Sequence, residues 1–156
     1  PLTPGEWLAA HSAVNVAVVA LAAAALVGLT VALTGAAVRA SVLVAAFVAA
    51  GVTVFCSVGA LLGRLADSQD GVIAAANAVG FPLLFLSETF VPPSLLPAWF
   101  RPAVTLSPLT YFARGVRAAT APSLQPGTDP LFALTVLVAL AVGFFAAAAV
   151  ALPWSE

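Results

Sequence analysis

The sequence predicts an all-α integral membrane protein with four transmembrane helices and two short interfacial or re-entrant helices before the last of them. The 156 residues are 63% hydrophobic and 7% charged, and they include no lysine. A water-soluble domain of this length has too little core to bury so many apolar side chains. Four apolar stretches also reach the roughly 20 residues that a membrane-crossing helix needs. These spans lie near 13–34, 41–63, 71–91 and 131–152, which predicts a multi-pass protein of the cell membrane.

Charge and composition exclude several function classes. Five arginines against six acidic residues give no basic surface for nucleic acid. The single cysteine, Cys56, can form neither an internal disulfide nor a multi-cysteine metal site. The sequence has no GxxxxGK[ST] phosphate loop, no dinucleotide fingerprint and no HExxH motif. We therefore expect no catalytic, cofactor-binding or metal site in this chain, and its start at Pro1 without any methionine predicts a piece of a longer protein.

The first helix has a readable start. Thr3 and Glu6 have the spacing of a capping box, with a proline at the first helical position. A helix from there to Thr34 would be about 46 Å long, well over the roughly 30 Å hydrocarbon core of a bilayer. Its first turns, with His11 and Asn15, are therefore predicted to lie in the membrane interface.

The second span ends at Arg64, and the loop after it is strongly hydrophilic. We expect a charged connection there, made of Asp67, Ser68, Gln69 and Asp70. Within the span, Gly59 and Gly63 match the small-xxx-small pattern that lets helix backbones approach closely. The pattern predicts that this side of the helix faces a neighbouring one.

Two residues of the third span depart from its apolar pattern. Asn77 is a neutral polar residue, which either lines a translocation path or makes a hydrogen bond between helices. Pro82 removes a backbone donor and is predicted to kink the helix.

Residues 92–130 contain too many prolines for another crossing and too many apolar residues for a free loop. The pattern predicts one short helix over 93–100 and a second over 108–120, where Ser107 is the N-cap and Pro108 the first helical residue. Helical spacing places Tyr111, Arg114 and Arg117 on one face of the second helix, and Leu109, Phe112 and Val116 on another. Both helices are expected to lie in the interface or to dip into it without crossing.

Glu88 follows Ser87 at the end of the third span. Its carboxylate either points to water or pairs with an arginine. The candidate partners are Arg101, Arg114 and Arg117. Ion pairing is favoured over direct binding of a transported molecule, and pairing with Arg114 or Arg117 would tie the short helices to the third span and restrain an outer gate.

The segment from Phe81 to Arg117 resembles the membrane-spanning subunit of ATP-binding-cassette exporters of the type-2 permease family. The matching residues are Pro82, Phe85-Leu86-Ser87, Phe90, Pro92, Leu96-Pro97, Trp99, Pro108-Leu109-Thr110-Tyr111 and Arg117. Glu88 departs from the family, which commonly has glycine there. The resemblance implies that the four spans are the last four helices of a six-helix permease domain, and that residues 92–120 lie on the extracytoplasmic side.

The resemblance also implies a function and partners. Two permease copies, identical or different, and two ATPase subunits would form an exporter in the lipid bilayer, with ATP and Mg bound by the ATPase subunits. Such exporters move hydrophobic or amphipathic cargo, such as drugs, lipids or glycans, outward by alternating access. The loop from Asp67 to Asp70 would contact the ATPase subunit. The outer gate would contain the family-motif residues Pro82, Ser87, Glu88, Pro97, Pro108, Tyr111, Arg114 and Arg117.

Two other classes compete with a transporter subunit. A non-transporting membrane anchor or regulatory module would share the apolar spans, whereas an intramembrane enzyme lacks residues to carry its chemistry. The arginines also argue against the orientation that the resemblance implies. Arg64 alone would be cytoplasmic, while Arg39, Arg101, Arg114 and Arg117 would lie outside, against the positive-inside rule. We follow the resemblance because the first helix often dominates topology, and it would precede Pro1.

Overall fold

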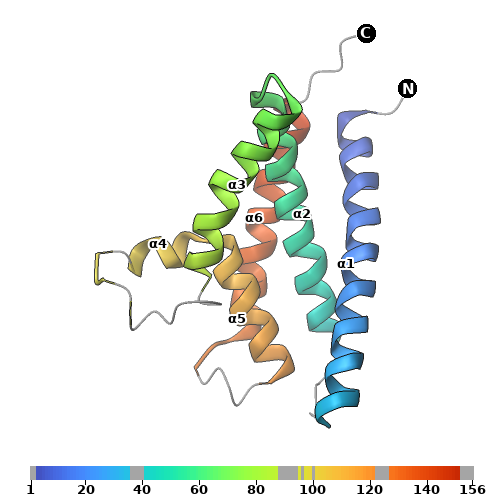
Figure 1. Cartoon of the computed structure of the whole chain (residues 1–156), viewed down its shortest axis with the longest axis vertical. Coiled ribbons are helices and arrows are strands. Elements are labelled where there is room, and N and C mark those ends of the chain that lie inside the picture. Colours follow the sequence, from blue (N-terminus) through green and yellow to red (C-terminus); the bar gives the residue numbers. More distant parts are fainter. Residues whose placement is uncertain are drawn as a thin grey trace.

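The computed structural model describes residues 3–35, 41–87, 95, 97–99, 101–121 and 127–151. Within these ranges the chain forms six helices and no strand (Figure 1). They are α1 (Pro4–Thr34), α2 (Val42–Leu65), α3 (Gln69–Leu86), α4 (Arg101–Leu106), α5 (Pro108–Thr120) and α6 (Pro130–Ala151). By length and composition, α1, α2, α3 and α6 can each cross a membrane. The all-α membrane fold is confirmed.

The N-terminus of α1 has the predicted capping box. Thr3 Oγ1 accepts a hydrogen bond from the Glu6 amide at 3.3 Å, and Glu6 Oε2 accepts one from the Thr3 amide at 2.7 Å. These bonds satisfy two backbone donors that a helix start otherwise leaves free. The helix ends at Thr34, and the C-cap residue Gly35 has a positive φ of 66°, which suits a residue without a side chain.

The core lies between α2 and α6. Phe47, Ala50 and Val54 on α2 pack against Ala133, Leu137 and Ala141 on α6. Each set recurs every three or four residues, so each forms one stripe along its helix. Alanines on both stripes let the two helices approach closely, which is how membrane helices gain packing contacts where lipid is as apolar as the core.

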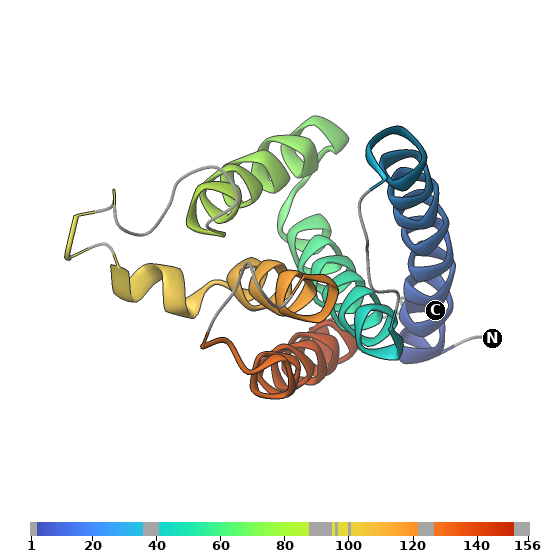
Figure 2. The same ribbon diagram turned by 90° about the horizontal axis from the view of Figure 1, so that it is seen from below.

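Around this pair, α2 contacts every long helix, and α5 contacts α2, α3 and α6. Figure 1 shows the start of α1, the end of α6 and the α2–α3 connection at one end of the bundle, with the start of α2 and the end of α5 at the other. Figure 2 shows α5 between α3 and α6, beside α2. The helix over 108–120 therefore packs among the long helices of the bundle.

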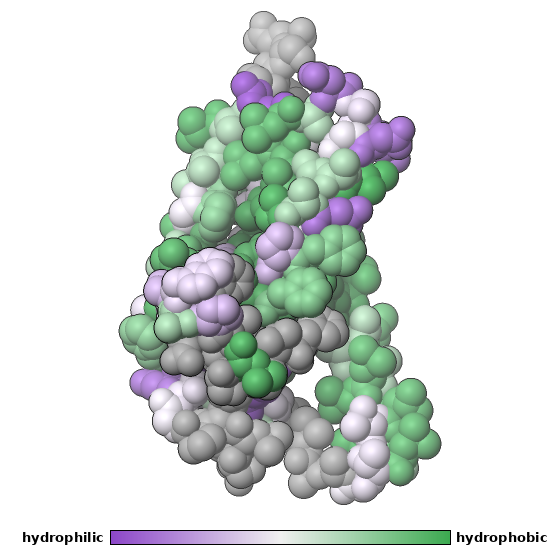
Figure 3. Space-filling model, turned by 60° about the vertical axis from the view of Figure 1, so that its left-hand side comes forward, coloured by the Kyte–Doolittle hydropathy of each residue, from purple (hydrophilic) through white to green (hydrophobic). Residues whose placement is uncertain are grey.

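Much of the surface is apolar. On α1 only Leu8 and Ser12 are buried, and α3 buries no residue of its helix. Figure 3 shows hydrophobic residues over most of the coloured face, with hydrophilic residues gathered most clearly at its upper end. Such a surface suits contact with lipid or with further membrane helices.

The predicted spans over 41–63 and 131–152 lie close to the bounds of α2 and α6, but the segment before α5 differs from the prediction. Half of the predicted helix over 93–100 falls outside the described residues, and within it Ala98 and Trp99 lie in a turn. The short α4, with Pro102 in its first turn, was missed because prolines there indicated a break. The third span was predicted to reach residue 91; α3 ends at Leu86, and 88–91 lie outside the described ranges.

Gly59 faces a neighbouring helix, as predicted, since it lines a pocket between α2 and α3, but the closest helix contacts lie at other glycines. A Cβ added at Gly59 or Gly63 would meet open space, so neither glycine marks a close helix contact within the described part of the chain. The close contacts lie at Gly51 on α2 and Gly115 on α5. In an alanine-rich helix, several pairs of small residues have the small-xxx-small spacing. Which of them makes a close contact depends on where the facing helix lies.

Candidate functional site

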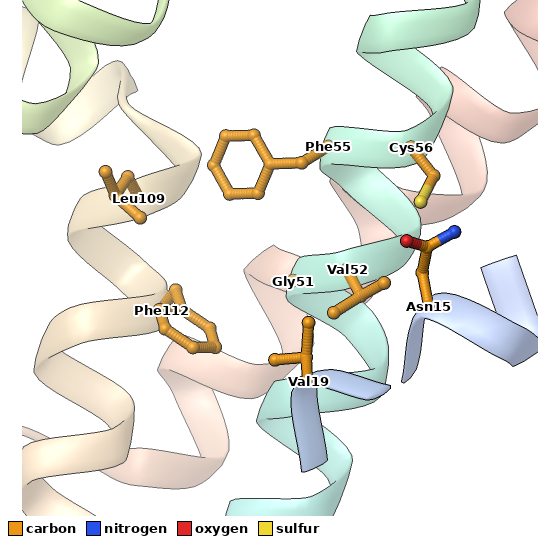
Figure 4. Close-up of a pocket in the computed structure, with 8 residues that line it drawn as sticks. All are labelled: Asn15, Val19, Gly51, Val52, Phe55, Cys56, Leu109 and Phe112. Atoms are coloured by element: carbon orange, nitrogen blue, oxygen red, sulfur yellow. The ribbon is translucent and has the colours of Figure 1, made fainter. Parts of the chain in front are cut away.

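A pocket of about 430 Å³ lies where α1, α2 and α5 meet (Figure 4). Its lining residues are Asn15, Val19, Gly51, Val52, Phe55, Cys56, Leu109 and Phe112. In Figure 4, Phe55 extends from α2 toward α5, and Phe112 extends from α5 toward Gly51. The walls are mostly apolar, with two aromatic rings and one side-chain amide, as in many small-molecule sites.

The start of α5 forms one wall, and its position is set by the Ser107-Pro108 element. Ser107 has extended backbone angles at the N-cap and Pro108 is the first helical residue, as predicted, but the Ser107 side chain makes no capping hydrogen bond. Thr110 is almost fully buried, and its Oγ1 donates a hydrogen bond to the Leu86 carbonyl at 2.9 Å. This bond joins the first turn of α5 to the last turn of α3, where carbonyls have no partner within the helix.

Two phenylalanine–glycine contacts hold α5 against α2. The ring of Phe112 lies over Gly51, where an added Cβ would come within 2.7 Å of Cδ2. The ring of Phe47 lies over Gly115 on α5 and occupies the space that a Cβ would need. Each helix thus supplies one ring and one glycine. The pocket wall formed by Phe112 is fixed in place by this packing.

Asn15 supplies the pocket's amide. Its Nδ2 donates to the His11 carbonyl at 2.8 Å, which is a bond within α1. Asn15 is half-buried, and Figure 4 shows its side chain and that of Cys56 pointing toward one another. Cys56 lies about 14 Å along α2 from the end of that helix at Leu65. Asn15 therefore lies beside the middle third of α2.

The sequence predicts the surplus length of α1 at its N-terminal end, with Asn15 in the interface, and the structure differs in where that surplus lies. The surplus length of α1 extends past α2 at the C-terminal end of α1, as Figure 1 shows, so the first turns of α1 lie alongside α2. The sequence shows a polar residue at this position of α1, but it does not show how α1 is aligned along α2. His11 stacks on Trp7, with ring centroids 5.2 Å apart, and does not line the pocket.

The motif residues lie around the junction of α3, α4 and α5. Pro82 is inside α3, and Ser87 caps its end, fully buried, with Oγ donating to the Leu84 carbonyl at 2.7 Å. Pro97 is exposed and Pro108 is half-buried. Glu88 lies outside the described residues, and its pairing stays a prediction.

The predicted separation of faces on α5 is wrong for Tyr111. Tyr111 packs against the α2–α6 core, as Phe112 and Val116 do, because α5 has helices on several sides. Arg114 and Arg117 are half-buried on the same helix. Their part in an outer gate stays a prediction.

The remaining predicted residues lie on α3 and before it. Asn77 is exposed and does not line the pocket. Asp67, Ser68, Gln69 and Asp70 are all exposed, and Ser68 Oγ accepts a hydrogen bond from the Gly71 amide at 3.1 Å as the N-cap of α3. Among the described residues, no three His, Cys, Asp or Glu side chains are grouped so as to hold a metal ion.

Comparison with known proteins adds a family match. The ABC-2 type transporter family profile matches residues 1–120, which contain the whole pocket. A daunorubicin resistance ABC transporter permease protein of Streptomyces coeruleorubidus is 29% identical over 87 residues. These residues are 56% of this chain and 29% of that permease, so the match spans less than a third of the relative's length. No solved structure matches the chain.

Proposed function

This chain belongs to the ABC-2 type transporter family, and we propose that it works in an exporter that moves hydrophobic or amphipathic molecules out of the cell by alternating access. Members of the family form the membrane-spanning permease of an ABC transporter, and the four apolar helices place this chain in the cell membrane as a multi-pass protein. The single observation that carries the proposal is the family match over residues 1–120, from α1 to the end of α5.

The direction and the cargo are proposed from two further observations. The similar permease is named for resistance to daunorubicin, and a transporter that protects a cell from a drug moves it outward. The pocket of this chain has apolar and aromatic walls with one amide, which suits an amphipathic molecule. Drugs, lipids and lipid-linked glycans share this character.

The energy source is proposed to be a separate ATPase subunit that binds ATP and Mg. Two permease copies, identical or different, would complete the exporter in the bilayer. The exposed segment from Asp67 to Asp70, which joins α2 to the first turn of α3, lies at the same end of the bundle as the start of α1 and the end of α6 (Figure 1). We place this end in the cytoplasm, where the loop would contact the ATPase subunit.

The opposite half of the exporter would contain the outer gate. The hydrogen bond from Thr110 to the Leu86 carbonyl supports a mechanical link between α3 and α5, so that movement of α3 would carry the short helices with it. Asn77, exposed on α3, would face either the translocation path or the second permease copy.

The competing function is a non-transporting membrane anchor or regulator. The full-length protein should be co-expressed with its ATPase subunit and purified as a complex. We expect the complex to hydrolyse ATP faster than the ATPase subunit alone and to be stimulated further by daunorubicin, because cargo binding and hydrolysis are coupled in a transporter. An ATPase variant with its phosphate-loop lysine replaced by alanine gives the background rate.

Three outcomes decide between the classes. An anchor would bind the ATPase subunit, but its hydrolysis would respond to no cargo. Failure of the two proteins to associate would contradict the proposed assembly. The permease purified alone should hydrolyse no ATP. Robust ATP turnover by the permease alone would contradict the proposal that a separate subunit supplies the energy.

A further inference from the structure

We propose that the pocket between α1, α2 and α5 binds an amphipathic molecule with fused aromatic rings, and that Asn15 Oδ1 accepts a hydrogen bond from it. This inference rests on the proposed function, since it names a binding site for the exporter's cargo. It is supported by one polar atom, by two aromatic side chains and by a second pocket that shares one lining residue with the first.

The polar atom is the amide oxygen of Asn15. The Asn15 Nδ2 group is already bonded to the His11 carbonyl, and within the described part of the chain Oδ1 accepts no hydrogen bond. Asn15 lies beside the middle third of α2, a helix long and apolar enough to cross a membrane, and lipid tails offer no hydrogen-bond donor. An unpaired amide oxygen in such surroundings is unfavourable. A ligand with a hydroxyl or amine donor would satisfy it.

The aromatic side chains are Phe55 and Phe112. Both line the pocket, and Figure 4 shows them projecting from α2 and α5 into the region between these helices. The contact of Phe112 with Gly51 restricts its ring. Flat aromatic ligands gain from stacked or edge-to-face contact with such rings beyond their burial of apolar area. An acyl chain gains no such contact and has no donor for Asn15, which favours the aromatic ligand over lipid as the occupant.

Phe55 also lines a second pocket, of about 130 Å³, between α2 and α3. That pocket continues along α2 past Gly59 to Leu62, toward the end that carries the Asp67 loop. The ring of Phe55 therefore borders two adjoining spaces along one face of α2. A ligand would reach the larger pocket from the proposed cytoplasmic side by passing this ring.

Cys56 makes the proposal testable, because its thiol lines the same pocket. The full-length protein with its ATPase subunit is placed in nucleotide-free proteoliposomes, and the rate at which N-ethylmaleimide modifies Cys56 is measured by mass spectrometry of the peptide. Daunorubicin, a planar fused-ring molecule with hydroxyl and amine donors, is the probe. The Cys56→Ser variant gives the background. We expect daunorubicin to slow the modification several-fold with a saturable dose dependence.

Variants of Asn15 separate the hydrogen bond from simple filling of the pocket. Asn15→Leu should raise the daunorubicin concentration for half-protection about tenfold, the value of one hydrogen bond of ordinary strength. Asn15→Gln keeps an amide oxygen and should retain most of the protection. Thr30→Val removes a polar group from the same helix outside the pocket and should change nothing. Co-elution with the ATPase subunit in gel filtration shows that each variant is folded.

Phenanthrene has three fused rings and no donor, so it should protect Cys56 weakly and equally in the native protein and in Asn15→Leu. Equal protection by phenanthrene and daunorubicin in the native protein would overturn the role of Asn15. Absence of any protection at saturating daunorubicin would overturn the site. If the same vesicles still transport daunorubicin on addition of ATP, the site is wrong and the proposed function stands. Protection without ATP-driven transport would support the site and contradict the proposed function.

Discussion

The ring of Phe47 on α2 fills the space beside Gly115 on α5 that the Cβ of any other residue would occupy. Phe47 is fully buried and belongs to the α2–α6 core. The helix α5 therefore touches the core of the bundle directly. The matching contact of Phe112 with Gly51 lies on the pocket side, so one pair of helices supports both the core and the candidate site.

Replacing Gly115 with alanine should lower the free energy of unfolding by about 1–3 kcal/mol, because the added methyl group forces a ring in a packed core to move. Thermal unfolding of the detergent-solubilised protein measures the change. Gly59→Ala is the matched control, since a Cβ there meets open space. Alanine is the better helix former, so the control should be neutral or slightly stabilising. Equal effects of the two substitutions would contradict the contact with Phe47.

Replacing Thr110 with valine should cost about 1–2 kcal/mol, since it removes the donor to the Leu86 carbonyl at a buried position. The control is Thr135→Val on α6. Thr135 is exposed and bonds to the carbonyl of Leu131 within its own helix, so its loss should be small. Hydrogen exchange adds a local readout: the last turn of α3 should lose protection in Thr110→Val and keep it in the control.

A cysteine at Gln69 should react with a membrane-impermeant maleimide only after cells are opened, if the α2–α3 connection is cytoplasmic. Gln69 is a better position than Ser68, whose hydroxyl caps α3. A cysteine at Thr34, at the opposite end of α1, should react in intact cells. Both variants are made in a Cys56→Ser background. The reversed pattern would support the orientation that the positive-inside rule favours.

The proposed pairing of Glu88 with Arg114 or Arg117 is tested by a double-mutant cycle. Alanine at Glu88 or at its partner should lower the folded yield or export, and the double replacement should recover part of the loss, because an unpaired, partly desolvated charge is worse than none. A control cycle combines Glu88→Ala with Arg64→Ala, because Arg64 lies at the other end of the bundle from the end of α5. Strict additivity would leave the two arginines as anchors to lipid headgroups.

Local signals in the sequence predicted local structure. The capping box at Thr3 and Glu6 and the Ser107-Pro108 start of α5 are both present, because a helix start depends on a few neighbouring residues. Four long apolar runs likewise form four long helices, since a helix satisfies all backbone groups in lipid.

Contacts between helices could not be predicted in the same way. The helix α6 is apolar on all sides, so nothing in its pattern singles out Ala133, Leu137 and Ala141 as the core stripe. The sequence predicts the first turns of α1, with Asn15, in the interface. Their position alongside α2 depends on the register between the two helices, which is a tertiary property. The same holds for Gly51 and Gly115, whose role appears once the rings of the facing helix are placed.

The central claim is that this chain forms the membrane path of an ATP-driven exporter, and transport itself tests it most directly. The full-length protein and its ATPase subunit are reconstituted in proteoliposomes, and daunorubicin accumulation by complexes whose ATPase faces outward is followed by fluorescence after ATP and Mg are added. We expect ATP-dependent accumulation that vanishes when the phosphate-loop lysine of the ATPase is replaced by alanine. Daunorubicin accumulation that is unaffected by that replacement would contradict the claim. So would the absence of accumulation for every amphipathic drug and lipid tested, if the intact complex still hydrolyses ATP.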